Sequence, residues 1–304
     1  MRLETLLRTP RPAHVFAVAD DGLLYGRHGR QRDALERVDR QALPPGWYQL
    51  GPVGVLQVER QPLADALAAL LPRLEPRPKR ASLIVPNAWV RHLVLELESV
   101  PRQRDEAEDV LRWRLKKLLP CRPEDVRLDW LPLGRAGRVL VELALDRPLA
   151  ALEAAVEAAD VTIGCIEPSV TALAALVPAE ARPAVLVVIE DRAFTLVMIT
   201  GKRLALARHK ALPADGVAAA AVLTRELAQT LAHAREQEEL AANPSVWLAP
   251  PDHPAAAAVE AWAAGQPGTA VRRLAVGEGR VPALPPLPIV PLWAMLATAW
   301  GGTA

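Results

Sequence analysis

The chain is short of several apolar residue types, because its 304 residues include only 2 Phe, 2 Tyr and 3 Met. Hydrophobic residues still make up 51% of the chain and charged residues 23%, which excludes a disordered or fibrous protein and allows a large core. That core must come mainly from Leu, Val and Ala, with 8 Trp, in a chain interrupted by 29 Pro. The length predicts one large domain or two of medium size.

The chain also lacks an excess of either charge, since 36 basic and 35 acidic residues give a net charge of +1. Nucleic-acid binders carry a basic excess or a basic stripe, so we expect no nucleic-acid partner. The 2 cysteines, Cys121 and Cys165, fit neither a zinc site nor a disulfide-stapled secreted domain. The 6 His are scattered without a His-x-x-x-His pair, and we expect no metal site.

No hydrophobic run has the length of a membrane span, which needs about 20 apolar residues. The longest candidate, residues 287–300, is interrupted by Pro288 and Pro291. The first twelve residues carry several arginines and no apolar core of a signal peptide. We therefore expect a cytoplasmic protein without a membrane span of its own.

The pattern of apolar runs predicts two α/β halves that repeat one order of elements. We expect strands in the first half at residues 14–19, 23–25, 51–58 and 81–86, with a helix at 62–74. We expect strands in the second half at residues 184–189, 193–199, 203–208, 245–248 and 270–274, with helices at 217–240, 253–263 and 292–300. The predicted subdomains are residues 1–180 and residues 181–304.

A block at about residues 89–146 is predicted as an insert in the first half. Its order is strand, helix, strand, strand, at residues 92–97, 101–119, 125–133 and 138–145. The helix has acidic residues in its first turns and basic residues in its last turns, which suits the helix dipole, and Pro120 is expected to end it. After the insert we expect a helix at 149–159, a strand at 161–166 and a helix at 171–177, with Ser169 as its N-cap.

The segment at residues 118–130 reads Leu-Leu-Pro-Cys-Arg-Pro-Glu-Asp-Val-Arg-Leu-Asp-Trp. It resembles a segment of the PilM-like family, the actin-like cytoplasmic proteins of type IV pilus assembly, to which the cytoplasmic domains of type II secretion L-type proteins are related. Family members typically have Leu or Ile, Pro, Phe and Pro there, then two acidic residues and a Leu-Asp-Tyr strand. Here Cys121 replaces Phe, Arg122 precedes Pro123, and Trp130 replaces Tyr. The resemblance implies an actin-like (ribonuclease H-like) α/β fold of two subdomains, with the insert in the first half.

Five residues of the insert are candidates for docking a partner: Trp113, Pro120, Pro123, Asp129 and Trp130. The alternative is a purely structural corner, because Pro120 and Pro123 fix φ and end the helix sharply. Trp113 lies among four basic residues, a pattern that also fits nucleic acid or phospholipid. Its place at a helix end, after acidic first turns, favours a solvated face instead.

The resemblance also implies three loops that hold ATP in actin-like proteins: two hairpin turns with Asp-x-Gly-Ser/Thr, and a Gly-Gly loop near the adenosine. The corresponding positions of this chain are Asp20, Asp21 and Gly22; Glu190, Asp191 and Arg192; and Pro250 and Pro251. Leu23 supplies no hydroxyl after the first turn, the second turn has no glycine, and the two prolines have no N–H to donate. We therefore expect that nucleotide binding has been lost.

Together these observations predict a non-enzymatic cytoplasmic scaffold of a type IV pilus or type II secretion-like assembly, with no catalytic residue, cofactor or metal. Its expected partner is the cytoplasmic tail of an inner-membrane pilus or secretion subunit, which would hold the chain at the inner membrane. Self-association is left open. The alternative is an ATP-binding actin-like protein, with Mg²⁺ and weak or no hydrolysis. A sugar-kinase-like enzyme is a third alternative, for which the sequence offers no evident carboxylate base.

Overall fold

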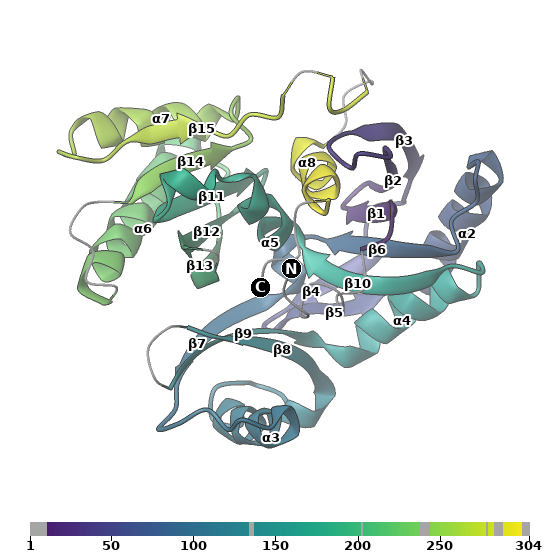
Figure 1. Cartoon of the computed structure of the whole chain (residues 1–304), viewed down its shortest axis with the longest axis horizontal. Helices are drawn as coiled ribbons and strands as arrows, with labels where there is room; N and C mark the ends of the chain where they lie inside the picture. Colours follow the sequence, from purple (N-terminus) through teal and green to yellow (C-terminus); the bar gives the residue numbers. More distant parts are fainter. Residues whose placement is uncertain are drawn as a thin grey trace.

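Two five-stranded sheets with the same strand order form the centre of the molecule (Figure 1). The computed structural model describes residues 11–133, 137–201, 203–237, 244–277, 279–282 and 288–299. Besides the two large sheets, these residues form a three-stranded sheet in the insert and a two-stranded hairpin, β4 (Tyr48–Gly51) and β5 (Gly54–Val58).

The first sheet contains β1 (His14–Ala19), β2 (Gly22–His28), β3 (Leu35–Ala42), β6 (Arg80–Val85) and β10 (Thr162–Pro168). In the order β10-β6-β1-β2-β3, the strands β1, β2 and β3 are antiparallel neighbours, whereas β1, β6 and β10 are parallel. The predicted Asp-Gly turn joins β1 to β2. Phe16 and Val18 pack on one face of β1, Val15 and Ala17 on the other. The strand is therefore buried on both faces.

The second sheet repeats this arrangement. It contains β11 (Ala184–Glu190), β12 (Ala193–Thr200), β13 (Arg203–Ala211), β14 (Ser245–Ala249) and β15 (Val271–Arg273). Its order is β13-β12-β11-β14-β15, with an antiparallel meander on one side of β11 and parallel strands on the other. The predicted repetition of an α/β topology in the two halves is therefore confirmed.

Helices cover both sheets and fill the space between them. The helices are α2 (Arg60–Leu70), α4 (Asp146–Glu157), α5 (Ser169–Leu173), α6 (Gly216–Gln237), α7 (Pro254–Ala264) and α8 (Ile289–Ala297). The side chains of α2 and α4 pack on one face of the first sheet, and those of α6 and α7 pack on one face of the second. The helices α5 and α8 share one apolar cluster with strands of both sheets. This shared cluster joins the two halves.

The C-terminal helix α8 lies against the first half of the chain. It contacts β1, β2, β6 and α5, and Thr298 Oγ1 at its end lies 2.9 Å from His28 Nε2 in β2. Residues that the sequence places in the second subdomain therefore complete the packing of the first sheet (Figure 1).

The insert has the predicted order of strand, helix, strand, strand. It consists of β7 (Arg91–Glu96), α3 (Arg104–Leu115), a 3-10 turn at Pro123–Asp125, β8 (Val126–Pro132) and β9 (Arg138–Leu145). The strand order is β7-β9-β8, and Leu111 and Leu115 of α3 are buried against this sheet. The helix ends at Leu115, four residues before the predicted end. The chain tightens there into a bond from the Leu118 N–H to the Leu115 carbonyl, because Pro120 disfavours a helical Leu119.

Two strands were not predicted: β3, and β4, which pairs with β5 where the sequence predicts a single strand at residues 51–58. The residues 27–40 look polar, yet β3 forms there because it is an edge strand, with Leu35 and Val38 buried and its other side chains partly or fully exposed. Both cysteines are free. No helix among the described residues is long and apolar enough to cross a membrane. The predicted helical residues 238–240 and 300 lie outside the described residues.

Candidate functional site

The three predicted nucleotide loops come together at the ends of the central strands; we call them the turn cluster. Asp20 and Asp21 form the β1–β2 turn, Asp191 and Arg192 form the β11–β12 turn, and Pro250 and Pro251 follow β14. The charge of Asp20 acts on Glu190 at the end of β11, and the charge of Asp191 acts on His253 beyond the prolines. The structure therefore gathers these segments as the resemblance implied.

The carboxylates of the β1–β2 turn form hydrogen bonds and ion pairs with other side chains of the protein. Tyr48 donates its hydroxyl hydrogen to Asp20 Oδ1, and Trp47 Nε1 donates to the Asp20 carbonyl at 3.2 Å. Arg40 forms an ion pair with Asp21. A Cβ at Gly22 would lie 2.9 Å from Arg40 Nε, so this glycine leaves room for the Arg40 side chain.

A cluster of aromatic residues lies next to this turn and bonds to it through Trp47 and Tyr48. The ring centroids of Trp47, Tyr48 and Trp89 lie 5.1 to 5.5 Å apart, and Trp47 and Trp89 are buried. Burial and the bond to Asp20 raise the pKa of Tyr48 well above its usual value, so the phenol remains a donor. The hairpin β4–β5 approaches so closely that a Cβ at Gly54 would lie 2.2 Å from the Trp89 carbonyl oxygen.

Asn87 links the two halves at the turn cluster. It is fully buried, its Nδ2 donates to Glu190 Oε2 at 3.2 Å, and its Oδ1 accepts from the Val170 N–H at 2.7 Å. The Asn87 side chain therefore accepts from an N–H group in the first turn of α5, that of Val170, which was the role predicted for Ser169. That prediction was wrong: the Ser169 hydroxyl donates instead to the Val85 carbonyl at 3.3 Å, because α5 begins directly after β10.

The environment of Glu190 destabilises the charged form of its carboxyl group. Its pKa is raised to about 7, mainly by burial and also by the charges of Asp20 and Asp191, while the hydrogen bond from Asn87 lowers it. The turn cluster therefore concentrates negative charge around Glu190. Such a cluster repels a polyphosphate unless cations accompany it.

The loop after β14 offers few backbone donors. Pro250 and Pro251 have no N–H, and the His253 N–H points back to the Pro250 carbonyl at 3.5 Å. The His253 ring caps α7 by accepting from the Ala255 N–H at 3.1 Å. Within the described ranges, no three His, Cys, Asp or Glu side chains converge as a metal site would require.

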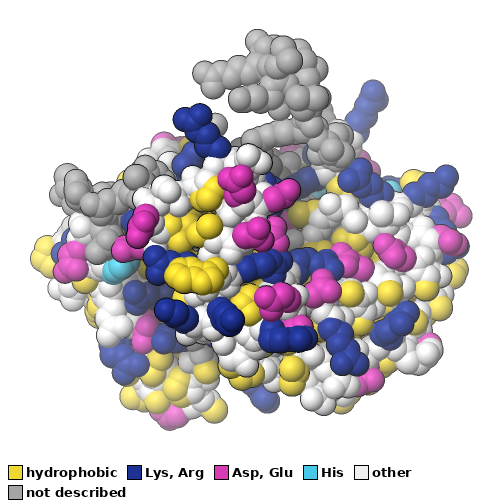
Figure 2. All heavy atoms as spheres, turned by 90° about the horizontal axis from the view of Figure 1, so that it is seen from below, with side chains coloured by type: hydrophobic (Ala, Val, Ile, Leu, Met, Phe, Trp, Pro, Cys, Tyr) yellow, Lys and Arg dark blue, Asp and Glu magenta, His cyan; other side chains and the backbone are white. Residues whose placement is uncertain are grey.

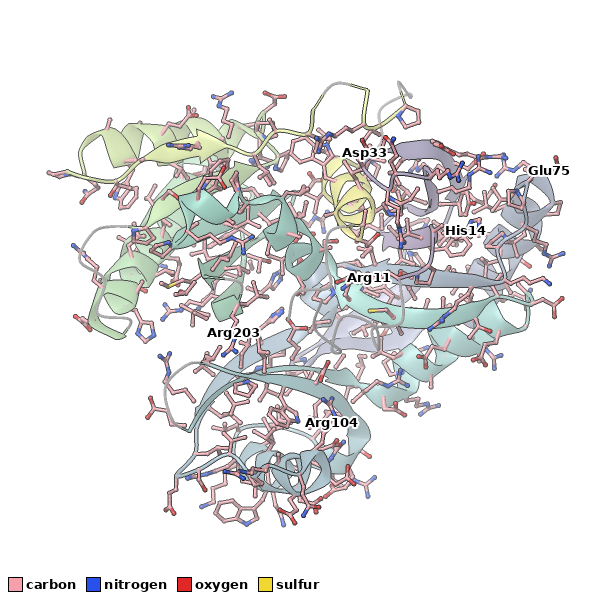
Figure 3. All side chains as sticks on the ribbon, viewed as in Figure 1. Arg11, His14, Asp33, Glu75, Arg104 and Arg203 are labelled. Carbon is pink, nitrogen blue, oxygen red and sulfur yellow. The ribbon has the colours of Figure 1, made fainter. Side chains whose placement is uncertain are left out.

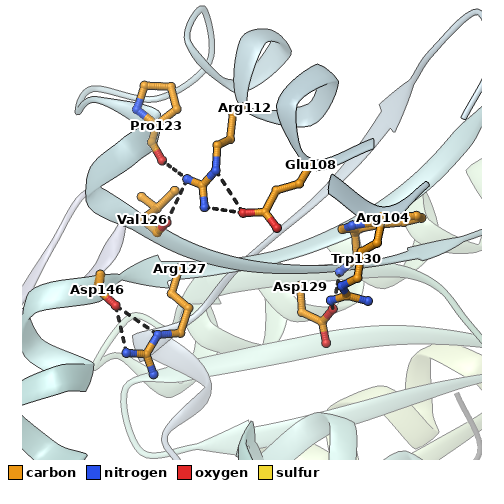
Figure 4. A network of polar contacts seen from close by, with 9 residues as sticks. All are labelled: Arg104, Glu108, Arg112, Pro123, Val126, Arg127, Asp129, Trp130 and Asp146. Carbon is orange, nitrogen blue, oxygen red and sulfur yellow. Dashed lines mark hydrogen bonds and ion pairs between the residues drawn. The ribbon is translucent and has the colours of Figure 1, made fainter. Parts of the chain in front are cut away.

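The second candidate region is the insert corner, residues 112–132, where α3 turns into β8 (Figure 4). Arg112 holds this corner together: its guanidinium donates to Glu108 Oε1 at 2.6 Å, to the Val126 carbonyl at 3.1 Å, and to the Pro123 carbonyl. Pro123 is buried beneath it. Arg112 was not predicted as a key residue, because two of its acceptors lie across the corner.

The structure brings two of the five docking candidates together. Asp129 accepts from Arg104 Nη2 at 2.6 Å, and the Arg104 guanidinium carbon lies 5.8 Å from the centre of the Trp130 ring (Figure 4). Trp130 is half-buried, and its indole N–H has no hydrogen-bond partner among the described residues. Pro120 is exposed, and the fifth candidate, Trp113, is exposed on α3.

The insert is joined to the rest of the molecule by residues that the sequence did not indicate. Arg203 reaches from β13 to the Pro132 carbonyl at 3.3 Å (Figure 3). Glu142 of β9 accepts from the Thr171 hydroxyl of α5 at 3.0 Å. Within the insert, the same carboxylate lies 3.1 Å from His92 Nε2. These contacts join residues that are far apart in the sequence, so no local motif predicts them.

Comparison with known proteins defines the fold class. No family model matches the chain, and no curated protein matches it. Among solved structures, the chain is similar to a protein with an actin-like ATPase fold and unknown function from Bacteroides thetaiotaomicron, with 10% identity, a TM-score of 0.51, and 85% of this chain and 89% of that chain covered. The chain therefore has an actin-like fold.

Two further structures refine this class. The PilM-PilN type IV pilus biogenesis complex matches with 18% identity and a TM-score of 0.69, over 96% of this chain and 98% of that chain. The cytoplasmic domain of EpsL, an inner-membrane component of the type II secretion system of Vibrio cholerae, matches with 12% identity and a TM-score of 0.50, over 94% and 93%. The predicted resemblance to PilM is confirmed at the level of the fold.

Proposed function

We propose that this chain is a non-enzymatic cytoplasmic scaffold of a type IV pilus or type II secretion-like assembly, held at the inner membrane by the cytoplasmic tail of a membrane subunit. The observation that carries the proposal is the structural match to the PilM-PilN complex, which extends over nearly the whole of both chains. The match to the cytoplasmic domain of EpsL supports the same setting at an inner membrane.

The contacts of the turn cluster support a scaffold without ATPase activity. Asp20 and Asp21 are bound by Tyr48 and Arg40, whereas a catalytic carboxylate must be free to position Mg²⁺ and water. Glu190 adds a partly buried acid with a pKa of about 7 to the same place. The alternative, an ATP-binding protein with little hydrolysis, would need these side chains to rearrange around the nucleotide.

The insert corner is the proposed docking face for the tail. Asp129 is largely exposed, with 73% of its side chain accessible, and it stands beside Trp130, whose indole N–H lacks a partner within the described part of the chain. A peptide that reached this corner would find an exposed carboxylate and the accessible part of an aromatic ring. These groups suit an extended basic and apolar tail.

Titration of labelled synthetic tails from inner-membrane pilus and secretion subunits against the full chain tests the proposal. We expect one tail to bind saturably, and Asp129→Ala to weaken that binding. Asp105→Ala is the matched control, because it removes the same charge from an exposed position of the same insert. A tail that binds equally well to both variants would place the docking face elsewhere, and failure of every tail would overturn the proposed function.

A further inference from the structure

The C-terminal end of α3 exposes large hydrophobic side chains that the core does not use. Trp113 is 60% exposed and Leu118 is 50% exposed, whereas α3 packs on its sheet through Ala107, Leu111 and Leu115. Large exposed aromatic groups on a surface point to an interaction site when charged groups accompany them. We call this region, residues 113–118, the α3 tip.

Basic side chains surround Trp113. The Arg114 guanidinium carbon lies 5.5 Å from the centre of the Trp113 ring, and Lys117 Nζ lies 5.7 Å from it. Lys116 is exposed beside them. Cations at these distances interact with the face of the indole ring. The tip thus combines an aromatic group with positive charge.

The charge along α3 is strongly asymmetric. Its first two turns carry the acidic residues, of which Glu108 is paired with Arg112, and residues 110–123 contain no acidic residue. The Arg112 side chain is used inside the corner, so Arg114, Lys116 and Lys117 carry the outward positive charge. The overall net charge of +1 conceals this local excess.

The surroundings of the tip favour a broad flat partner over a peptide. The helix α3 lies on the outer side of the insert, at the edge of the molecule (Figure 1). Seen from that side, basic side chains stand around hydrophobic ones on an outward-facing surface (Figure 2). A bilayer interface accepts Trp at the headgroup level and attracts Lys and Arg when its lipids are anionic.

We propose that the α3 tip binds the surface of an anionic lipid bilayer, with Trp113 and Leu118 at the headgroup level and Arg114, Lys116 and Lys117 facing lipid phosphates. The proposal rests on the proposed function for its setting at the inner membrane, and it adds a contact that requires no protein partner. The tip would then orient the scaffold on the membrane while the tail of the membrane subunit anchors it.

Flotation of the full chain with protein-free vesicles tests this proposal. We expect binding to vesicles of mixed phosphatidylcholine and phosphatidylglycerol, and none to phosphatidylcholine alone. The double variant Arg114→Glu and Lys117→Glu should bind at least about tenfold more weakly, because each basic residue near an anionic surface contributes about 1 kcal/mol. Raising the salt concentration should weaken binding of the unaltered chain, since the Debye length falls to about 3 Å at 1 M.

Two further variants separate the tip from general charge effects. Trp113→Ala keeps every charge and should still weaken binding to the vesicles. Because Trp113 is exposed, this variant should fold normally, which circular dichroism will verify. Arg30→Glu with Arg225→Glu makes the same change in net charge at exposed positions outside the insert, and it should bind as the unaltered chain does.

Three outcomes would overturn the proposal. The first is equal binding to neutral and anionic vesicles, and the second is equal loss in the tip and control variants. The third is binding to soluble polyglutamate, but not to anionic vesicles, with the same dependence on the tip, which would assign the surface to an acidic protein. The vesicles hold no other protein, and the tail titration holds no lipid, so the two experiments are independent. A chain that does not bind vesicles would not contradict the proposed function, and a chain that binds no tail would not contradict binding to vesicles.

Discussion

At the scale of single residues, Glu190 shows how burial rather than sequence identity sets the chemistry of the turn cluster. An acidic residue in a hairpin turn is ordinarily solvated and charged. Here the end of β11 is packed against the buried Asn87 side chain, and the pKa of Glu190 is raised from 4.5 to about 7. Its charge is therefore unfavourable in the folded protein at neutral pH.

This pKa predicts a pH dependence of stability. Between pH 4.5 and about 7 the folded protein holds the Glu190 proton more tightly than the unfolded chain does, so the contribution of this group to stability falls as the pH rises. We expect Glu190→Gln to raise the free energy of unfolding at pH 8, by at most about 3 kcal/mol. Near pH 4 the difference should vanish. Urea unfolding at both pH values measures it, and an equal difference at both would contradict the assigned pKa.

Asn87 and Ser169 form a second test at this scale. Removing the Asn87 amide leaves the buried Val170 N–H without its acceptor, so Asn87→Ala should cost about 1–3 kcal/mol of stability. Ser169→Ala is the control, because its hydroxyl makes one long bond to the Val85 carbonyl and does not cap α5; it should cost less. Thermal unfolding of both variants decides whether the cap is the asparagine or the serine, and a larger loss for Ser169→Ala would restore the sequence-based assignment.

At the scale of elements, the sequence predicts well what is decided locally. The Asp-Gly turn and continuous apolar runs predict the β1–β2 hairpin and the meander β11–β12–β13, although β2 and β13 are longer than the predicted strands at residues 23–25 and 203–208. The strand β3 was missed because its sheet edge tolerates polar residues. The turn-cluster contacts were missed for a different reason: Asn87 and Glu190 are 103 residues apart in the chain, and only the folded topology brings them together.

The insert corner shows the same limit on prediction. Two prolines and an acidic pair mark a turn in the sequence, yet the side chain that closes the turn, Arg112, lies on the preceding helix. Its three acceptors are a carboxylate and two carbonyl groups, those of Pro123 and Val126. These contacts give part of the family-like segment a structural role, beside the docking role that we propose for Asp129 and Trp130.

This role of Arg112 predicts a clear difference between two arginines of the corner. Arg112→Ala leaves the carbonyl groups of buried Pro123 and Val126 without their donor and should cost about 1–3 kcal/mol of stability. Arg122→Ala is the matched control, because its bond to Asp125 is exposed, with 79% of the Arg122 side chain accessible; solvent screening should leave the midpoint nearly unchanged. Equal losses of stability for the two variants in urea unfolding would contradict this role of Arg112.

At the scale of the whole molecule, two repeated sheets and an insert give an actin-like fold in which Tyr48 and Arg40 bind the carboxylates of the β1–β2 turn. The proposal of a scaffold predicts that Mg-ATP leaves the unfolding temperature unchanged at millimolar concentration. A ligand present at 100 times its Kd would add about 2.7 kcal/mol to stability. A saturable, magnesium-dependent rise in a thermal shift experiment would favour the ATP-binding alternative.

The central claim is that the chain joins an assembly by holding the cytoplasmic tail of an inner-membrane subunit. The most direct measurement is size-exclusion co-elution of the full chain with the purified subunit in lipid nanodiscs, with and without that tail. We predict one complex with the intact subunit, and none after the tail is deleted. A complex that survives the deletion, or no complex with the intact subunit of any pilus or secretion system that accompanies this chain, would contradict the account.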